Sequence, residues 1–392
     1  MRLLIISHTP HYFKSGTIVG WGPTIREIDQ LASLFSSVSH IAPLHNQQPP
    51  ESSLAYQENN VVFKGVKPSG GNTLFEKLKI ILQIPGYVKI IFDEMRNVDI
   101  VHVRCPANIS FIALFLLIFI KKPKLRWVKY AGNWLTYPNE PILYKIQKWI
   151  LRKNLIRGFV TINGKWKNQE KHIFSFYNPS LSFQELIISK EMALGKEIDF
   201  PIRIIFVGRV ESAKGIGRII EISKFLKDSG LDFSIEIIGD GEERVHYQKI
   251  SEDLGLSNNI FFSGWLPKDE LGSRYKKAHF ILFPSTASEG WPKVLSEAMS
   301  YGVVPITSTI SSVPQILNDF GAGVAVPVDD IASYVSTILY LSTDIQQWKK
   351  FRDAGANSSY TFSYDYYKKA VRSAFFDFYQ IDIIQHSFEN EK

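Results

Sequence analysis

The sequence lacks the features of three classes of protein: disulfide-rich proteins, zinc proteins and proteins with a secretion signal. Its single cysteine, Cys105, excludes an internal disulfide framework and is typical of a reducing compartment. Its cysteine and histidines never fall at zinc-ligand spacing, and no metal site is expected. The N-terminal stretch MRLLIISHTPHYF lacks the long apolar run and cleavage site of a secretion signal, so we expect a cytoplasmic protein.

What is present describes a globular chain with a basic excess. Its 392 residues are too many for one ordinary core and predict two domains. The apolar fraction of 45% and the charged fraction of 21% are those of a folded protein. The formal charge of +7 favours an anionic partner, either nucleotide phosphates, a lipid surface or nucleic acid, without choosing among them.

The longest apolar run, ISFIALFLLIFI at residues 109–120, is shorter than the roughly twenty residues needed to span a bilayer. Its length favours a buried core helix over a membrane contact. Upstream, residues 75–97 mix lysines with an apolar stripe, which is typical of a solvated amphipathic helix. The same pattern suits peripheral contact with an anionic membrane, here the inner face of the plasma membrane.

Short runs rich in Ile, Val and Phe alternate with helix-length segments in both halves of the chain. This pattern predicts parallel sheets covered by helices on both faces. We therefore expect an α/β fold with two doubly wound, Rossmann-like domains facing each other across a cleft. The runs are RLLIIS, SVSHIAPL, DIVHVRC, RWVKYAG and GFVTING, then RIIFVGRV, FSIEIIGDG, NIFFSGW, HFILFPS, VVPITS and GVAVPV.

The expected domains are residues 1–180 and 201–360. The alternation lapses between them, and turn residues collect there, so 181–200 are expected to form a linker. Residues 361–392 are expected to form a helix that returns to the N-terminal domain, followed by a frayed tail.

The first motif, FVGRVESAKGIGRIIEI at residues 206–222, places two cations at a strand end. Arg209 and Lys214 follow Gly208, and Gly215 precedes a helix. Glycines let a backbone approach a bulky anion, and a helix start offers free N–H groups for it. The alternative is a surface loop with two solvated cations. The three-glycine spacing of a dinucleotide-binding loop is missing, which disfavours an oxidoreductase.

Two weaker motifs follow later strands. Gly239, Asp240 and Gly241 form a turn that either borders a ligand or is capped by the aspartate. Gly264, before Trp265, borders a nucleotide base or belongs to an aromatic turn packed on the core.

The fourth motif, FPSTASEGWPKVLSEAMSYGVVP at residues 283–305, runs from a buried strand into a helix. Pro292 suits the helix start. Glu289 precedes the helix, and Glu297 lies beyond its first turn, off the apolar face. Small residues from Ser285 to Gly290 leave space and free backbone donors. We expect a pyrophosphate on the helix N–H groups and sugar hydroxyls on the two carboxylates; the alternative is one capping and one solvated acid.

GRVESAKG followed by SEGWPKVLSEAMSYGVVPITS resembles the donor domain of the retaining GT-B glycosyltransferases of the family-four type. The resemblance is strong over residues 200–330 and looser over 1–170. It implies an N-terminal acceptor-binding domain and a C-terminal domain that binds a nucleoside-diphosphate sugar. The E-x7-E pattern of that family is met by Glu289 and Glu297.

The resemblance also implies residue roles. Arg209 and Lys214 would hold the diphosphate and offset charge on the departing nucleotide, and Glu289 would bind donor-sugar hydroxyls, so these three are the expected catalytic residues. The expected donor-binding residues are Gly20, Gly22, Gly208, Gly264, Gly290, Trp291, Pro292, Lys293, Val294 and Glu297, with Glu297 on the nucleotide ribose.

The sequence departs from the family pattern in the N-terminal half. The usual adjacent glycine pair is GWG here, and Ala131 and Gly132 stand where a histidine is expected. Arg104 and Asn133 are then the expected acceptor-side residues. His102 is expected to be structural.

These expectations combine into a retaining glycosyltransferase that passes a sugar to a glycan or lipid-linked acceptor of cell-surface polysaccharide or lipopolysaccharide. No Asp-x-Asp metal motif occurs, so metal-independent transfer without a cofactor is expected. The alternative is a non-catalytic sugar-nucleotide binding or scaffold protein. A nucleic-acid partner is not expected, since only the basic charge would favour it.

Overall fold

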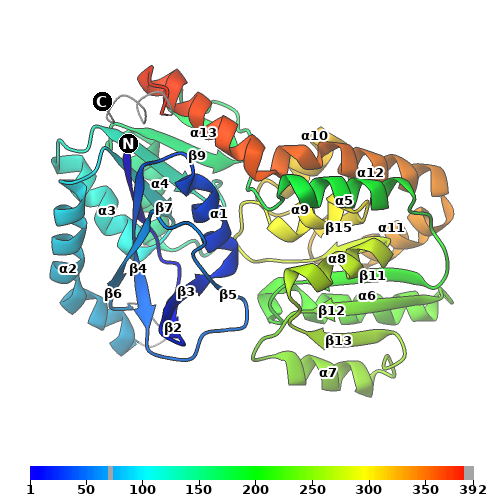
Figure 1. Cartoon of the computed structure of the whole chain (residues 1–392). Coiled ribbons are helices and arrows are strands. Elements are labelled where there is room, and N and C mark those ends of the chain that lie inside the picture. Colours follow the sequence, from blue (N-terminus) through cyan, green and yellow to red (C-terminus); the bar gives the residue numbers. More distant parts are fainter. Residues whose placement is uncertain (69–73, 384–392) are drawn as a thin grey trace. The chain divides into compact units, whose positions relative to one another are not determined.

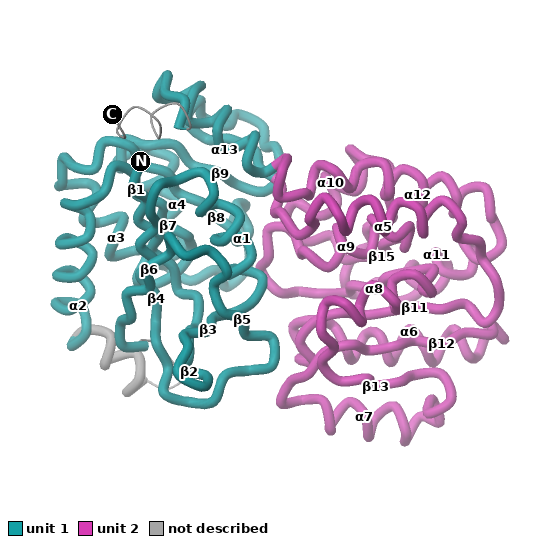
Figure 2. Tube along the Cα trace, viewed as in Figure 1, with its two compact units in different colours: residues 1–176, 367–392 teal, residues 177–366 magenta. Residues whose placement is uncertain are grey.

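The computed structural model describes residues 1–68 and 74–383, and it divides into two compact units. Unit 1 contains residues 1–176 and 367–392, and unit 2 contains residues 177–366 (Figure 2). The tail expected at the C-terminus lies almost wholly outside the described residues. Two α/β units are thus present, as the alternating pattern predicts.

Unit 1 is built on a mixed sheet with a parallel centre. Its strands run in the order β10-β9-β8-β7-β1-β4-β2-β3-β5, and β6 also pairs with β4. Of these strands, β2 to β7 and β9 are labelled in Figure 1. The pairs of β3 with β2 and β5 are antiparallel. The strands are β1 (Arg2–Ile6), β2 (His11–Lys14), β3 (Thr17–Trp21), β4 (Ser37–His45), β5 (Ser53–Ala55), β6 (Val61–Val66), β7 (Ile100–Cys105), β8 (Leu125–Tyr130), β9 (Phe159–Asn163) and β10 (Ile173–Phe176).

Helices cover both faces of this sheet. One face packs on α2 (Leu74–Met95), α3 (Asn108–Phe119) and α4 (Ile142–Arg152). The other packs on α1 (Gly22–Ala32) and on α13 (Tyr364–Tyr379), whose Val371 and Phe375 are fully buried. The expected return of the C-terminal helix to the N-terminal unit is confirmed. The apolar run at residues 109–120 forms α3, which buries one side in the core and leaves Phe115 and Phe119 exposed.

Unit 2 contains a wholly parallel sheet in the order β13-β12-β11-β14-β15-β16. Its central strands β11, β14 and β15 are buried along almost their whole length, as expected for a parallel sheet covered on both faces. The strands are β11 (Ile202–Val207), β12 (Phe233–Ile238), β13 (Ile260–Gly264), β14 (Phe280–Phe283), β15 (Val304–Ser308) and β16 (Val324–Val326). The helices are α5 (Phe183–Leu194), η1 (Ser212–Lys214), α6 (Ile216–Asp228), α7 (Arg244–Asp253), α8 (Lys268–Lys277), α9 (Lys293–Ser300), α10 (Val313–Phe320), α11 (Ile331–Thr343), α12 (Ile345–Ser358) and η2 (Ser359–Phe362).

The expected linker at residues 181–200 is wrong, because most of it forms α5. Ser182 caps this helix: its Oγ accepts a hydrogen bond from the Glu185 amide, and the Glu185 carboxylate accepts one from the Ser182 amide. This reciprocal pair satisfies two amide donors at the helix start. The signal was present in SFQE, but the neighbouring turn residues obscured it.

Candidate functional site

Three loops meet at the carboxyl edge of the unit 2 sheet. The Gly208 amide donates to the Ile238 carbonyl over 3.0 Å, and the Gly239 amide donates to the Gly264 carbonyl over 2.7 Å. The Val210 amide donates to the Asp240 carbonyl over 3.0 Å. The first three sequence motifs therefore lie side by side, in the place where open α/β sheets bind ligands.

Close backbone packing explains the glycines of the second motif. Gly239 has a φ of +137°, and a Cβ there would lie 1.8 Å from the Gly208 carbonyl oxygen. A Cβ at Gly241 would lie 2.3 Å from the Val210 carbonyl oxygen. Both positions need glycine whether or not a ligand lies nearby.

Lys214 and Glu289 form an ion pair at the same edge. Only 12% of the Lys214 side chain is exposed, and its Nζ lies 5.6 Å from the centre of the Phe283 ring. Burial lowers the pKa of Lys214 to about 8, with Arg209 adding to the shift and Glu211 opposing it. The pair joins the first and fourth motifs, which stand 75 positions apart in the sequence.

Arg209 lies beside this pair but extends into solvent. Its side chain is 75% exposed, and its Nε lies 3.5 Å from the Glu211 carboxylate. An exposed guanidinium on a strand-end loop can turn toward an incoming anion at little cost. Of the three expected catalytic residues, Lys214 and Glu289 are thus in contact, whereas the Arg209 guanidinium contacts Glu211.

The loop after β14 is fastened to η1. The amides of Thr286 and Ala287 both donate to the Ala213 carbonyl, over 2.8 and 3.2 Å, and so does the Ser285 hydroxyl over 3.1 Å. The expectation of free backbone donors here is wrong for these two amides. Their bonds hold Glu289 against Lys214.

Helix α9 begins after Pro292, which occupies its N-cap position. Lys293, Val294 and Glu297 are half-buried, and the Gly290 carbonyl accepts a 2.7 Å bond from the Ser312 hydroxyl. The Glu297 carboxylate accepts a 3.4 Å bond from the hydroxyl of Tyr275, a residue the sequence reading missed.

Trp291 does not present its side chain to this site. The indole is only 2% exposed, stacks on Phe362 with ring centres 5.2 Å apart, and donates to the Ser296 hydroxyl. Its carbonyl accepts a bond from Asn178. The expected donor-binding role of the Trp291 side chain is wrong, because it belongs to the core.

In unit 1, Gly20 and Gly22 are explained by packing around β3 and α1. A Cβ at Gly20 would lie 2.6 Å from the His11 ring, and one at Gly22 would lie 2.6 Å from the Ser52 carbonyl oxygen. The intervening Trp21 is 48% exposed. The GWG sequence thus has a structural reason that does not involve a ligand.

The acceptor-side expectations are wrong for both side chains. Arg104 Nη1 lies 2.6 Å from the fully buried Glu27 carboxylate, which also binds Lys129 Nζ at 2.6 Å and the Tyr367 hydroxyl at 3.2 Å. The Asn133 side chain is buried and accepts a bond from the Leu135 amide. Both are held inside unit 1.

The histidines of unit 1 are also internal. His102 is fully buried and stacks on Trp127, with ring centres 3.7 Å apart, which confirms its structural role. The sequence reading missed a chain of hydrogen bonds at the end of β1. In it, the Tyr56 hydroxyl lies 2.6 Å from His40 Nδ1 and 2.7 Å from His11 Nε2, while Ser7 bonds the far side of His40.

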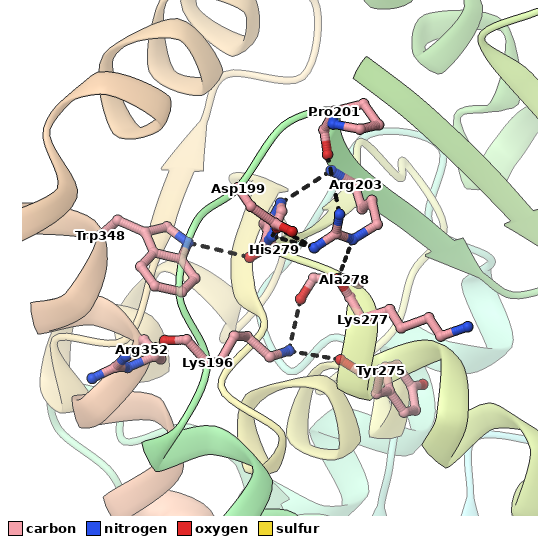
Figure 3. Close-up of polar contacts among 10 residues, drawn as sticks. All are labelled: Lys196, Asp199, Pro201, Arg203, Tyr275, Lys277, Ala278, His279, Trp348 and Arg352. Carbon is pink, nitrogen blue, oxygen red and sulfur yellow. Dashed lines mark hydrogen bonds and ion pairs between the residues drawn. The ribbon is translucent and has the colours of Figure 1, made fainter. Parts of the chain in front are cut away.

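Figure 3 shows a second polar cluster of unit 2, before the starts of β11 and β14. The buried Lys196 donates to the carbonyls of Tyr275 and Ala278, both over 2.7 Å, at the end of α8. His279 bonds Asp199 and Arg203 over 2.9 Å each. Burial lowers the pKa of Lys196 well below its usual value. This cluster lies at the amino edge of the sheet, where it joins residues 196–203 to α8.

No group of three or more His, Cys, Asp or Glu side chains in residues 1–68 and 74–383 is arranged to hold a metal ion. In the same residues, none of the helices combines the length and hydropathy needed to cross a membrane.

The family match falls on the unit that contains this candidate site. Residues 195–358, less than half of the chain, match the family described as Glycosyl transferases group 1. Two relatives are the amylovoran biosynthesis glycosyltransferase AmsK of Erwinia amylovora and the putative colanic acid biosynthesis glycosyltransferase WcaL of Escherichia coli. The chain is 30% identical to AmsK over 147 residues, which are 36% of each protein. It is 30% identical to WcaL over 153 residues, which are 37% of each. The similarity thus spans only about a third of these relatives.

The fold extends the likeness over the whole chain. Sucrose-phosphate synthase from Thermosynechococcus elongatus superimposes with a TM-score of 0.73 at 13% identity, covering 97% of this chain and 99% of that one. The architecture is accordingly the two-domain α/β fold of GT-B type.

Proposed function

We propose that this protein is a retaining glycosyltransferase. It transfers a sugar from a nucleoside-diphosphate sugar to a glycan or lipid-linked acceptor in the synthesis of cell-surface polysaccharide or lipopolysaccharide. The observation that carries the proposal is the half-enclosed pair of Lys214 and Glu289 at the carboxyl edge of the unit 2 sheet. The matched family and the two relatives support the same class of reaction.

The chemistry assigned to the cations is stabilisation of the leaving group. Departure of a nucleoside diphosphate places negative charge on its terminal phosphate, and fixed positive groups stabilise such charge in advance. Lys214 is held in position by its surroundings, and Arg209 closes on the phosphates from solvent. Glu289 then accepts hydrogen bonds from the donor sugar, and Glu297 from the ribose.

The proposed transfer is a front-face substitution without a metal ion. The bond from the anomeric carbon to the phosphate oxygen breaks, and the acceptor oxygen bonds the same face of that carbon. The acceptor hydroxyl proton passes to the departing phosphate oxygen. This route needs no general base from the protein, which suits a chain with Ala131 and Gly132 where the family carries a histidine.

A panel of nucleotide sugars tests the binding part of this proposal. A ligand that binds the native state raises its melting temperature, so calorimetry with UDP-, GDP-, ADP- and dTDP-sugars identifies the donor. Lys214→Ala and Glu289→Ala should abolish hydrolysis and transfer of that donor. Lys224→Ala, an exposed lysine on the outer side of α6, is the matched control. Full activity in both site variants would refute the assignment.

The second candidate is a sugar-nucleotide binding or scaffold protein without catalysis, which the absent histidine favours. It predicts a raised melting temperature with a nucleotide sugar but no release of nucleoside diphosphate with any acceptor. Measurement of diphosphate release across a broad acceptor panel separates the two.

A further inference from the structure

Helices α3 and α4 of unit 1 expose an unusual set of apolar side chains. On α4, Ile142, Ile146 and Trp149 follow one another at helical spacing, and they are 74%, 36% and 55% exposed. On α3, Phe115 and Phe119 are 53% and 70% exposed, and their rings touch with centres 5.1 Å apart. The sheet-facing sides of both helices are buried in the same core, so these side chains point outward.

The same helices carry cations without exposed acids. Glu140 is the only acidic residue from position 101 to 169, and its buried carboxylate lies 2.5 Å from Lys148. The exposed cations in that stretch are Lys121, Lys122, Lys124, Lys145, Arg152, Lys153, Arg157, Lys165 and Lys167. The neighbouring α2 adds the acids Asp93 and Glu94 and the cation Lys89, and Arg96 directly follows it, so these four charges cancel.

The cations at the two helix ends lie close together. Arg126 Nη1 donates to the carbonyls of both Leu117 and Ile156, over 2.7 and 2.8 Å, and Arg157 donates to the Ile118 carbonyl over 2.9 Å. These bonds join the end of α3 to the segment after α4. We define the basic apolar face as Phe115, Phe119, Lys121, Lys122, Ile142, Lys145, Ile146, Trp149, Arg152 and Lys153.

We propose that the basic apolar face docks unit 1 on an anionic phospholipid bilayer. Amphipathic helices that lie in the interfacial plane combine an apolar side with lysine and arginine at its borders, and anionic lipids strengthen their binding. Trp149 suits the headgroup boundary, where tryptophan is enriched. The long stems of Lys145 and Lys153 allow their ammonium groups to reach phosphates while the helix lies flat.

The charge pattern favours a bilayer over other anionic partners. A nucleic acid would use the cations but leave Ile142, Ile146 and the two phenylalanines in water. Open α/β sheets bind ligands at the carboxyl ends of their strands. The carboxyl end of β8 leads into the segment before α4, so the apolar start of α4 follows that edge of the unit 1 sheet in the chain. The inference concerns lipid binding alone and does not depend on the proposed transfer reaction.

Vesicle sedimentation tests the proposal with the whole protein and no nucleotide sugar. We expect binding to phosphatidylcholine vesicles that contain phosphatidylglycerol, much weaker binding to phosphatidylcholine alone, and loss of binding at high salt. Lys122→Glu with Lys153→Glu, and separately Ile146→Ser with Trp149→Ser, should each weaken binding about tenfold or more. Brominated lipid should quench fluorescence in the wild type, and Trp149→Phe should remove that quenching.

Matched controls lie on unit 2. Val245→Ser removes a side chain that is 78% exposed on α7, and Lys224→Glu with Lys249→Glu reverses two exposed charges. Both controls should bind vesicles as the wild type does, and all variants should keep their melting temperature. Equal binding by all variants would overturn the proposal. The proposal would also be overturned if the protein bound homopolymeric RNA instead of vesicles and Trp149→Ser left that binding unchanged. A dimer that forms without vesicles and that Trp149→Ser dissociates would overturn it as well.

Discussion

Lys214 shows how a single side chain can be prepared for an anion. Its ammonium is taken out of water and paired with one carboxylate, while Arg209 stands nearby in solvent. Burial is the largest cause that disfavours the charged form, and its pKa falls to about 8. A bound diphosphate would supply the negative charge that the site lacks.

This pKa predicts the pH dependence of diphosphate binding. Below pH 8, Lys214 is protonated and the affinity is at its plateau. Above pH 8, the free protein must take up a proton to bind, so the affinity should fall by up to about tenfold per pH unit. Calorimetric titration at several pH values, with whichever of UDP, GDP, ADP and dTDP binds most tightly, measures this dependence of the affinity on pH.

Lys214→Arg is the control for this pH effect. A guanidinium stays charged at every accessible pH, so the fall above pH 8 should disappear even if the affinity itself is lower. An unchanged fall in the arginine variant would assign the titration to another group.

At the residue scale, the sequence predicted the site better where polar groups lie at strand ends than where they lie inside a core. The pairing of Lys214 with Glu289 follows from two strand-end motifs on adjacent strands, because parallel strands present their carboxyl ends at one edge. Arg104 lies near the end of β7 and Asn133 follows β8, yet both side chains turn inward. The buried carboxylate that binds Arg104 comes from α1, and a single sequence gives no signal for that distant contact.

Among the elements, the short turn between η1 and α6 fixes the position of Lys214. Gly215 has a φ of +87°, and a Cβ there would lie 2.2 Å from the Pro284 carbonyl oxygen. This contact joins the Lys214 loop to the end of β14. The turn therefore sets the distance between the two halves of the candidate site.

Gly215→Ala should displace this turn, and Gly230→Ala is its matched control. Gly230 has a similar φ of +78°, but no atom lies within 4 Å of its added Cβ. The control should lose only about 1–2 kcal/mol of unfolding free energy, the cost of left-handed backbone. The Gly215 variant should lose more and should also bind the nucleoside diphosphate more weakly. Urea unfolding and calorimetric titration measure both, and equal behaviour of the two variants would contradict this role.

The elements that the sequence predicted are those with continuous apolar patterns. Parallel strands and the long core helix α3 have enough consecutive apolar residues to indicate burial. The hairpin of β2 and β3 is absent from the predicted strands, because its four- and five-residue strands carry polar residues and a glycine. Helix α5 was missed because it buries few side chains, notably Ser189 and Ala193.

For the whole molecule, the division into two units predicts that a core substitution destabilises only the unit that contains it. Phe375 is fully buried in unit 1, and its ring centre lies 4.9 Å from that of Phe159. Phe375→Ala should destabilise unit 1 by about 3–5 kcal/mol. The neighbouring Phe376 is 54% exposed, so Phe376→Ala should have little effect.

Hydrogen exchange followed by mass spectrometry locates this effect. In the Phe375 variant, β1, β7, β8 and β9 should lose protection together with α13, while β11 to β16 keep theirs. Equal loss of protection in both sheets would contradict the division into units.

The C-terminal helix also sets an order for biosynthesis. Residues 177–366 are contiguous, so unit 2 holds all its parts as soon as that stretch has left the ribosome. The earlier-made sheet has α1 on its second face but must wait for Tyr367, Val371 and Phe375 before the rest of that face is covered. Until residues 367–375 have been synthesised, that part of the apolar surface stays open to chaperones and to aggregation, so unit 1 begins first but is completed after unit 2.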